Sequence, residues 1–201
     1  MTDPTTHATQ PTPAIPDRPM LRGERVWLRP LEERDMPAFV AGVNDTEVGG
    51  WAGYRWPTTV ATASEWLTRV SEQERTQQGF HFAVCELGDD GFIGTIWLRD
   101  ISLLDGVGEL AIFMDKDHLG GGWGTDAQVA LLAFGFATLR LERIWLTVDA
   151  HNARAIRSYQ KAGFRQEGVM RKARQVNGVR VDGLLMAILR EEWQPEPEPA
   201  A

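Results

Sequence analysis

A cluster of glycines between an apolar strand and an apolar helix constrains this chain more than any other feature. Residues 109–114 predict a strand, four of the five residues in 120–124 are glycine, and residues 126–139 show helical spacing. The first turn of a helix leaves N–H groups unpaired, and glycine lets a ligand approach the backbone because it has no Cβ. The pattern predicts an anion-binding turn, to which Thr125 adds a hydroxyl.

Periodicity elsewhere predicts an α+β fold in one domain. The order β α α β β β α β α β β indicates an antiparallel meander, a strand–helix–strand crossover and a closing hairpin with its turn at Asn177-Gly178. The expected domain spans residues 21–193, and residues 1–20 and 194–201 are expected to be disordered tails. The strands are expected at 24–30, 80–85, 92–99, 107–114, 142–149, 164–173 and 179–189, and the helices at 32–43, 59–77, 126–139 and directly after Asn152.

Composition limits the class of protein. The net charge of −7 argues against a nucleic-acid partner, and the apolar runs are shorter than the ~20 residues of a membrane span. One cysteine, Cys85, argues against a disulfide framework and favours a cytoplasmic protein in which this thiol is buried. The four histidines form no pair or cluster with metal-ligand spacing, so we expect no metal.

Several ligands compete for the glycine cluster on pattern alone. A P-loop requires Lys and then Ser or Thr after its last glycine, and the residues after Gly124 are Thr and Asp. A dinucleotide site is a rival because residues 122–127 match G-x-G-x-x-A and Asp149 ends a later strand, but residues 115–119 separate the glycines from their strand. A coenzyme A pyrophosphate loop and a loop without a ligand also fit the pattern.

Four segments resemble sequences found in the GNAT superfamily of N-acetyltransferases. Residues 119–124, Leu-Gly-Gly-Gly-Trp-Gly, resemble its acetyl-CoA loop, usually Gln/Arg-x-x-Gly-x-Gly/Ala. The segments 177–186 and 190–193 resemble the branch that contains the ribosomal-protein-alanine acetyltransferases (RimJ/RimL-like), and the similarity runs from about Leu21 to Trp193. Residues 152–164 resemble the later motif of the superfamily at Asn152, Ala155, Tyr159, Lys161, Gly163 and Phe164.

The resemblance implies a GNAT-like mixed sheet with flanking helices and a central pair of parallel strands, 109–114 and 144–148, that diverge around coenzyme A. Leu119 stands where the family has Gln or Arg, so the glycine amides are left to hold the pyrophosphate. The pantetheine is expected to pair with the backbone of the first strand and with Asn152. The implied cofactor-binding residues are Ile112, Phe113, Met114, Leu119, Gly120, Gly121, Gly122, Trp123, Gly124, Thr125, Asn152 and Ala155.

The implied reaction moves an acetyl group from a thioester to an amine. An acid that protonates the departing thiolate and a base that accepts the amine proton would both accelerate it. Tyr159 matches the family position of the acid, and Glu109 is the candidate base, acting through water, because Thr147 stands where some relatives have a glutamate. The acceptor is expected at an aromatic loop that contains Trp51, Tyr54 and Trp56.

The sequence therefore predicts an acetyl-CoA-dependent N-acetyltransferase that works by direct attack in a ternary complex. The expected acceptor is a small-molecule amine or a protein N-terminus, and no nucleic acid or membrane partner is expected. A homodimer is a further expectation. Two different classes stay open: a coenzyme A-binding sensor or scaffold without turnover, and an NAD-dependent oxidoreductase.

Overall fold

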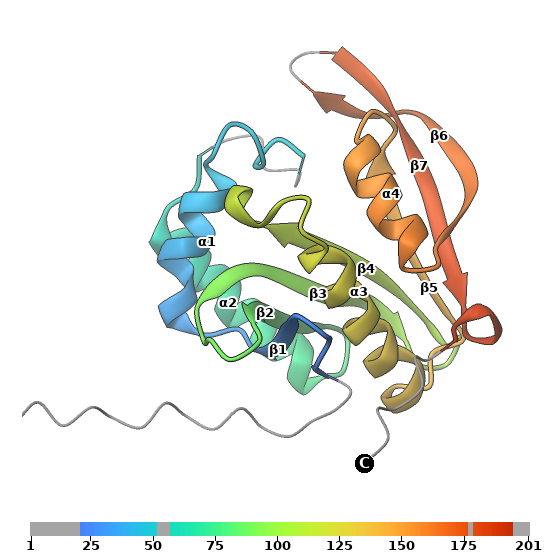
Figure 1. Ribbon diagram of the computed structural model, residues 1–201, viewed down its shortest axis with the longest axis horizontal. Coiled ribbons are helices and arrows are strands. Elements are labelled where there is room, and N and C mark those ends of the chain that lie inside the picture. The colour runs from blue at the N-terminus through green and yellow to red at the C-terminus, as the bar shows by residue number, and fades with distance from the viewer. Residues whose placement is uncertain (1–20, 52–56, 177–178, 195–201) are drawn as a thin grey trace, which may run out of the picture.

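The computed structural model describes residues 21–51, 57–176 and 179–194. These residues form a seven-stranded sheet in the order β1-β2-β3-β4-β5-β7-β6 (Figure 1). Neighbouring strands are antiparallel except β4 and β5, which are parallel. The strands are β1 Val26–Pro30, β2 Phe80–Glu86, β3 Phe92–Ser102, β4 Val107–Met114, β5 Arg143–Asp149, β6 Arg165–Val176 and β7 Val179–Leu189. The predicted α+β fold is confirmed, and the predicted turn at Asn177-Gly178 lies outside the described residues.

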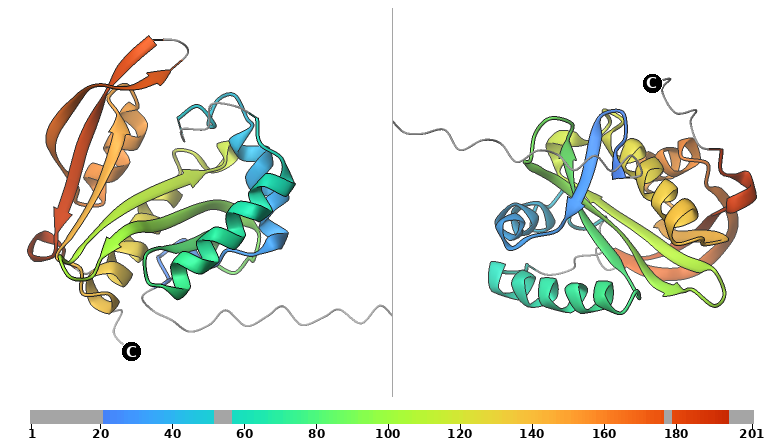
Figure 2. Two further views of the ribbon diagram at one scale, coloured as in Figure 1. Left: turned by 180° about the vertical axis from the view of Figure 1, so that it is seen from behind. Right: turned by 90° about the horizontal axis from the view of Figure 1, so that it is seen from below.

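In the described part of the chain, four α-helices cover the sheet, two on each face. Helices α1 (Met36–Val43) and α2 (Val60–Arg75) lie on one face, and α3 (Trp123–Ala133) and α4 (Ala153–Lys161) lie on the other (Figure 2). Within the described ranges, every helix is too short or too polar to cross a membrane.

Two helices differ from their predicted bounds for physical reasons. The helix expected at 126–139 begins at Trp123 and continues after Ala133 as a π-helical turn, Phe134–Thr138. A Cβ on Gly135, inside that turn, would lie 2.6 Å from the side chain of Ile144 on β5, so glycine allows the close approach of helix and sheet without displacing Ile144. The helix expected at 32–43 opens with a 3-10 turn, Glu33–Asp35, before α1.

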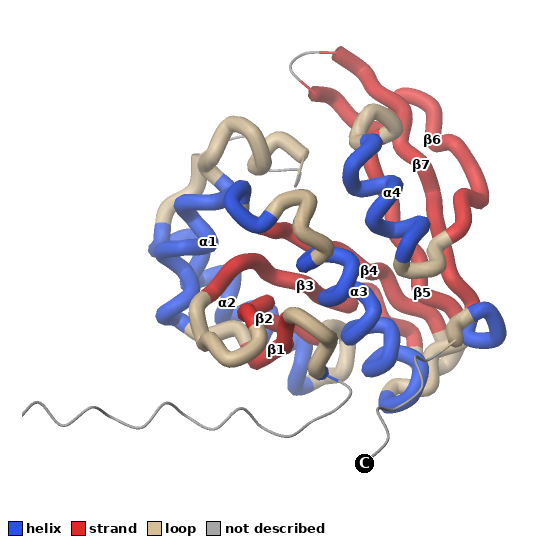
Figure 3. Tube along the Cα trace, viewed as in Figure 1, coloured by secondary structure: helices blue, strands red, loops and turns tan. Residues whose placement is uncertain are grey.

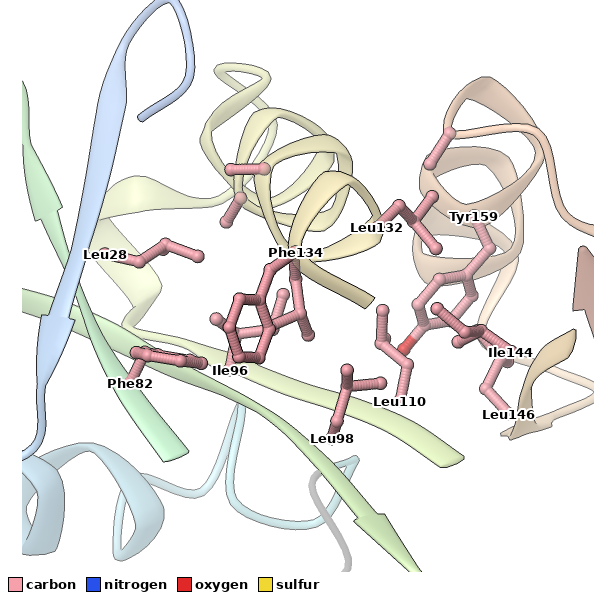
Figure 4. Packing of buried hydrophobic residues seen from close by; sticks show 14 of the residues in the cluster. Leu28, Phe82, Ile96, Leu98, Leu110, Leu132, Phe134, Ile144, Leu146 and Tyr159 are labelled. Atoms are coloured by element: carbon pink, nitrogen blue, oxygen red, sulfur yellow. The ribbon is translucent and has the colours of Figure 1, made fainter. Parts of the chain in front are cut away.

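The core has one apolar layer on each face of the sheet. On the α3 and α4 face, Ile96, Leu98, Leu110 and Leu146 pack with the helices (Figure 4). On the α1 and α2 face, Phe39 stacks on Trp66 and meets Phe113 edge to face. Cys85 is buried as predicted, and that burial raises the pKa of its thiol to about 11. The helices thus cover both faces of the sheet, and a cavity forms where β4 and β5 separate.

The separation of β4 and β5 positions the candidate site. The two strands pair only between Val107–Glu109 and Arg143–Trp145, although β4 continues to Met114 and β5 to Asp149. Strand β5 remains paired with β7 over its whole length, so it leaves β4 together with the C-terminal hairpin (Figure 3). The predicted parallel, diverging pair is confirmed.

Candidate functional site

A cavity of about 400 Å³ lies where β4 and β5 diverge. It brings together residues from both diverging strands, the glycine turn and the inner side of α4. The structure places most of the sequence-predicted residues in its lining: Trp51, Glu109, Ile112, Phe113, Met114, Leu119, Gly120, Gly122, Gly124, Thr125, Asn152, Ala155 and Tyr159. Gly121 and Trp123 do not line the cavity, and Tyr54 and Trp56 lie outside the described residues.

The glycine turn presents bare backbone to the cavity. Gly120 and Gly122 have φ of +86° and +89°, a conformation that residues with a Cβ adopt at a cost. A Cβ at either position would meet no atom within 4 Å. Gly122 is the N-cap residue of α3 and brings no side-chain cap, so the first-turn N–H groups of the helix remain open to a ligand.

Asp126 ties this turn to the segment before β1. Its carboxylate accepts hydrogen bonds from the backbone N–H groups of Glu24, Arg25 and Val26 at 3.0, 2.8 and 2.9 Å. Arg25 in turn donates to the carbonyl oxygen of Gly121. No local pattern marks this tether, because the partners lie about a hundred positions apart in the chain.

A polar network joins α3 to α4 beside the turn. The hydroxyls of Thr125 and Ser158 lie 2.8 Å apart, and Gln128 Nε2 donates to Ser158 Oγ at 3.1 Å. Gln128 is 2% exposed, and its Oε1 has no hydrogen-bond partner among the described residues. Gln128 and Ser158 were not predicted as site residues, although both line the cavity.

Tyr159 lies on the buried side of α4. Its ring packs edge to face with Phe164, and its hydroxyl points toward Leu110 on β4 (Figure 4). Burial raises the pKa of the phenol to about 12, against a smaller opposing effect of the Arg174 charge. The hydroxyl has no hydrogen-bond partner among the described residues, and Tyr159 lines the cavity. At neutral pH this phenol therefore keeps its proton.

Glu109 is held at the point where β4 and β5 part. Its two carboxylate oxygens accept hydrogen bonds from Arg99 Nε and Nη2, both at 2.9 Å, and the residue is 6% exposed. Across the opening, Arg174 Nη2 donates to the hydroxyl of Thr147 at 3.1 Å. Neither arginine was predicted as a site residue, because strand alternation alone does not say which exposed cations reach a cavity.

The start of α4 matches its predicted local structure. Asn152 Oδ1 accepts the backbone N–H of Ala155 at 3.1 Å, which makes Asn152 the N-cap residue. Gly163, after the helix, has φ of +100°, the positive φ that is common in the residue that ends an α-helix.

Asp149, at the end of β5, is 5% exposed, and its carboxylate accepts a hydrogen bond from the backbone N–H of His151.

Leu119 and the cavity charges bear on phosphate binding. The Leu119 side chain packs against the cluster that contains Phe39 and Phe113. This position therefore contributes apolar contact and offers no side-chain donor to a phosphate. The described lining residues include five Lys or Arg side chains against two carboxylates, on a chain of net charge −7. Three of the cations lie on α4: Arg154, Arg157 and Lys161. A locally cationic cavity with open backbone N–H groups is suited to a ligand with several phosphates.

Comparison with known proteins gives the family. Residues 25–165 match the family model described as acetyltransferase (GNAT) domain. A Bacillus subtilis protein named "Probable N-acetyltransferase YjcK" is 30% identical over 181 residues, which cover 86% of this chain and 98% of that protein. Spermidine N(1)-acetyltransferase of Escherichia coli K12 is 29% identical over 171 residues, which cover 85% of this chain and 89% of that protein.

A solved structure has the same fold. The crystal structure of spermidine N-acetyltransferase from Vibrio cholerae in complex with CoA and spermine has a TM-score of 0.74 and 23% identity, and the match covers 83% of this chain and 96% of that one. The family model runs from β1 to the end of α4 and includes every described cavity-lining residue except Arg174, which lies on β6. This chain therefore belongs to the GNAT family of acetyltransferases.

Proposed function

We propose that this chain transfers an acetyl group from acetyl-CoA to a primary amine, by direct attack of the amine while both substrates are bound. The observation that carries this proposal is the cavity between β4 and β5. It connects the open N–H groups at the start of α3 with the hydroxyl of Tyr159. Donors for phosphate and a protonated acid thus share one continuous space.

The residues of the turn and of β4 fit the two ends of coenzyme A. The N–H groups from Gly120 to Thr125 would bind the pyrophosphate, with Arg154 and Arg157 as nearby cations. Beyond Glu109, the β5-facing side of β4 has no strand partner among the described residues, and Ile112 to Met114 line the cavity there. An extended pantetheine would supply the hydrogen bonds that a neighbouring strand supplies elsewhere.

Acetyl-CoA supplies the acetyl group in activated form, as a thioester. Tyr159 would donate its proton to the departing sulfur, and its high pKa ensures that the proton is present at neutral pH. Glu109 would orient a water molecule that accepts the proton of the amine. Acid and base assistance are each worth about 10²–10⁴-fold, and positioning of the two substrates contributes more, up to about 7–11 kcal/mol.

Direct transfer is favoured over a covalent acetyl-enzyme by the position of the single cysteine. Cys85 is fully buried, its thiol has a pKa of about 11, and it does not line the cavity. A thiol in that state is a poor nucleophile, because the thiolate is the reactive form. Attack by the amine on bound acetyl-CoA needs no such residue.

The proposal is tested by binding and turnover together. Coenzyme A is expected to raise the melting temperature of the protein, and NAD to leave it unchanged, because only a ligand of the folded state stabilises by mass action. Free thiol released from acetyl-CoA in the presence of amines measures turnover. Initial velocities against both substrates should give intersecting lines, whereas parallel lines would indicate a covalent intermediate.

A melting shift with coenzyme A but no thiol release over a broad amine panel would instead indicate a sensor without turnover. A shift with NAD alone would refute the proposal.

A further inference from the structure

Side chains from both faces of the sheet line the cavity, and the two sides differ. Side chains alternate along β4, so that Leu110 packs with the α3 and α4 face whereas Phe113 packs with the α1 and α2 face. On β5, Leu146 and Val148 belong to the α3 and α4 layer, and Thr147 faces the other way. We call the side of the cavity on the α1 and α2 face the acceptor mouth, which is lined by Trp51, Trp97, Arg99, Glu109, Thr147 and Arg174.

Among the described residues, the acceptor mouth carries a surplus positive charge. These residues include two arginines and one carboxylate, and that carboxylate accepts hydrogen bonds from both Nε and Nη2 of Arg99. The pair of Arg99 and Glu109 is neutral overall. The guanidinium of Arg174 is therefore the uncompensated positive charge that faces an incoming acceptor.

A β-bulge brings Arg174 to this position. Between the paired positions Met170–Gly183 and Arg174–Val181, β6 advances by four residues while β7 advances by two. Lys172, in the bulge, has φ of +52°, and its backbone N–H is bound by the carboxylate of Asp182 at 2.7 Å. A bulge bends a strand and redirects its side chains, and bulges are frequent beside active sites.

Arg174 has no carboxylate within 4 Å among the described residues. The polar contact of its guanidinium is one hydrogen bond, to the neutral hydroxyl of Thr147. The side chain is partly buried, so the cation has lost part of its hydration without gaining an opposite charge. An anion regains that energy, and a carboxylate matches the planar guanidinium best because it accepts two parallel hydrogen bonds. An acceptor that carries another ammonium group besides its reacting amine would have that group repelled by the guanidinium of Arg174.

We propose that the acceptor carries a carboxylate near its reacting amine, and that Arg174 binds this carboxylate. The inference rests on the proposed acetyltransferase function and specifies its acceptor class. Two sources supply this chemistry: a free amino acid, and a peptide N-terminus with an acidic residue beside it. Acceptors that carry only ammonium groups, such as spermidine, are disfavoured by the same charge.

The test uses acceptors in matched pairs with the full chain. One pair is an amino acid and its C-terminal amide, and the other is a peptide with Glu or Gln at its second position. In one of the pairs, the carboxylate member is expected to have a kcat/KM about tenfold or more higher than the neutral member. The pair that shows this preference identifies the acceptor as a free amino acid or as a peptide N-terminus. Arg174→Gln should reduce this preference about tenfold, mainly through KM. Arg180→Gln, an exposed arginine outside the cavity lining, is the control and should keep the preference.

Three results would overturn the inference and leave the acetyltransferase function intact. The first is a preference for spermidine over the carboxylate-bearing acceptors. The second is an unchanged preference for the carboxylate member in Arg174→Gln, and the third is an equal loss of kcat for both members of a pair in that variant. If coenzyme A raises the melting temperature but every acceptor is inert, both members of each pair are titrated into the coenzyme A-loaded protein. Tighter binding of the carboxylate member would support the inference, and equal binding would overturn it. Failure of coenzyme A to bind would refute the proposed function itself.

Discussion

Tyr159→Phe separates catalysis from stability in this protein, because the phenolic hydroxyl makes no hydrogen bond to a described residue. The ring contact with Phe164, with centroids 5.9 Å apart, is kept in the variant. Removing the hydroxyl breaks no hydrogen bond to a described residue, and Tyr159 lines a cavity, so the substitution should change stability by less than about 1 kcal/mol. We expect a melting temperature within about 2–4 °C of the wild type, the shift that corresponds to about 1 kcal/mol for a chain of this size.

Turnover should respond in the opposite way. Without the phenol, the departing thiolate must take its proton from water, and kcat should fall by about tenfold or more. Coenzyme A binding should change little, because the turn and β4 provide the proposed contacts. The assay is release of free thiol under saturating acetyl-CoA, with the coenzyme dissociation constant measured in parallel. Near-normal kcat, or a fall in kcat explained by lost coenzyme affinity, would refute the assignment of Tyr159 as the acid.

The pH dependence of stability gives a second check on the same phenol. Tyr159 has a folded pKa of about 12 and an unfolded value near 10, so its stabilising contribution is complete below pH 10. It is lost as the pH rises from about 10 to about 12, because only the unfolded chain ionises in that range. The wild type should lose about 3 kcal/mol more than Tyr159→Phe over this interval. Equal losses would show that the phenol is not buried as described.

Two further substitutions test the interior and the base. Burial, with a smaller effect of the Arg99 charge, lowers the pKa of His81 to about 4, so its stabilising contribution is present above about pH 6.5 and is lost as the pH falls toward 4. His81→Phe keeps a ring beside Trp97, and its urea-unfolding free energy should fall less between pH 7 and 4, by up to about 3 kcal/mol. Glu109→Gln should lower kcat/KM about tenfold or more, measured by thiol release. An unchanged kcat/KM would remove Glu109 from the role of base.

The elements of this fold were largely predictable because their signals are local. Alternation located the strands, and residues such as Asn152 and Gly163 marked the ends of α4. Gly135 is a residue that helix propensity alone disfavours, and only the structure shows that Ile144 occupies the space a Cβ would need there. Local patterns report backbone preference, and close approach between distant segments is a property of packing.

The candidate site was predictable where a motif encodes it and not where distant segments meet. The glycine turn and Tyr159 were predicted from the sequence, and residues of the turn line the same cavity as Tyr159. Arg174 was missed because a bulge in β6 decides where its side chain points, and no periodicity marks that bulge. The tether of Asp126 was missed because its three partners are backbone N–H groups, which every sequence offers. Contacts of this kind depend on tertiary placement alone.

The divergence of β4 and β5 explains why a ligand with an extended arm fits here. Strand β5 is paired with β7 at seven positions, Arg143–Asp149, so it keeps that neighbour after it separates from β4. Strand β4 loses hydrogen bonds instead, because its β5-facing backbone beyond Glu109 has no strand partner in the described part of the chain. An unpaired strand edge binds an added extended segment, since its N–H and C=O groups gain hydrogen bonds.

This reasoning predicts a local effect on amide exchange. Coenzyme A should slow hydrogen exchange of amides in 110–114 and in the glycine turn, whereas exchange in β2, which is paired on both sides, should be the internal control. NAD should have no effect on these amides. Slower exchange throughout the molecule, with no excess in β4, would mean that coenzyme A stabilises the protein globally without pairing along this edge, and the strand-like placement of its pantetheine would then be wrong.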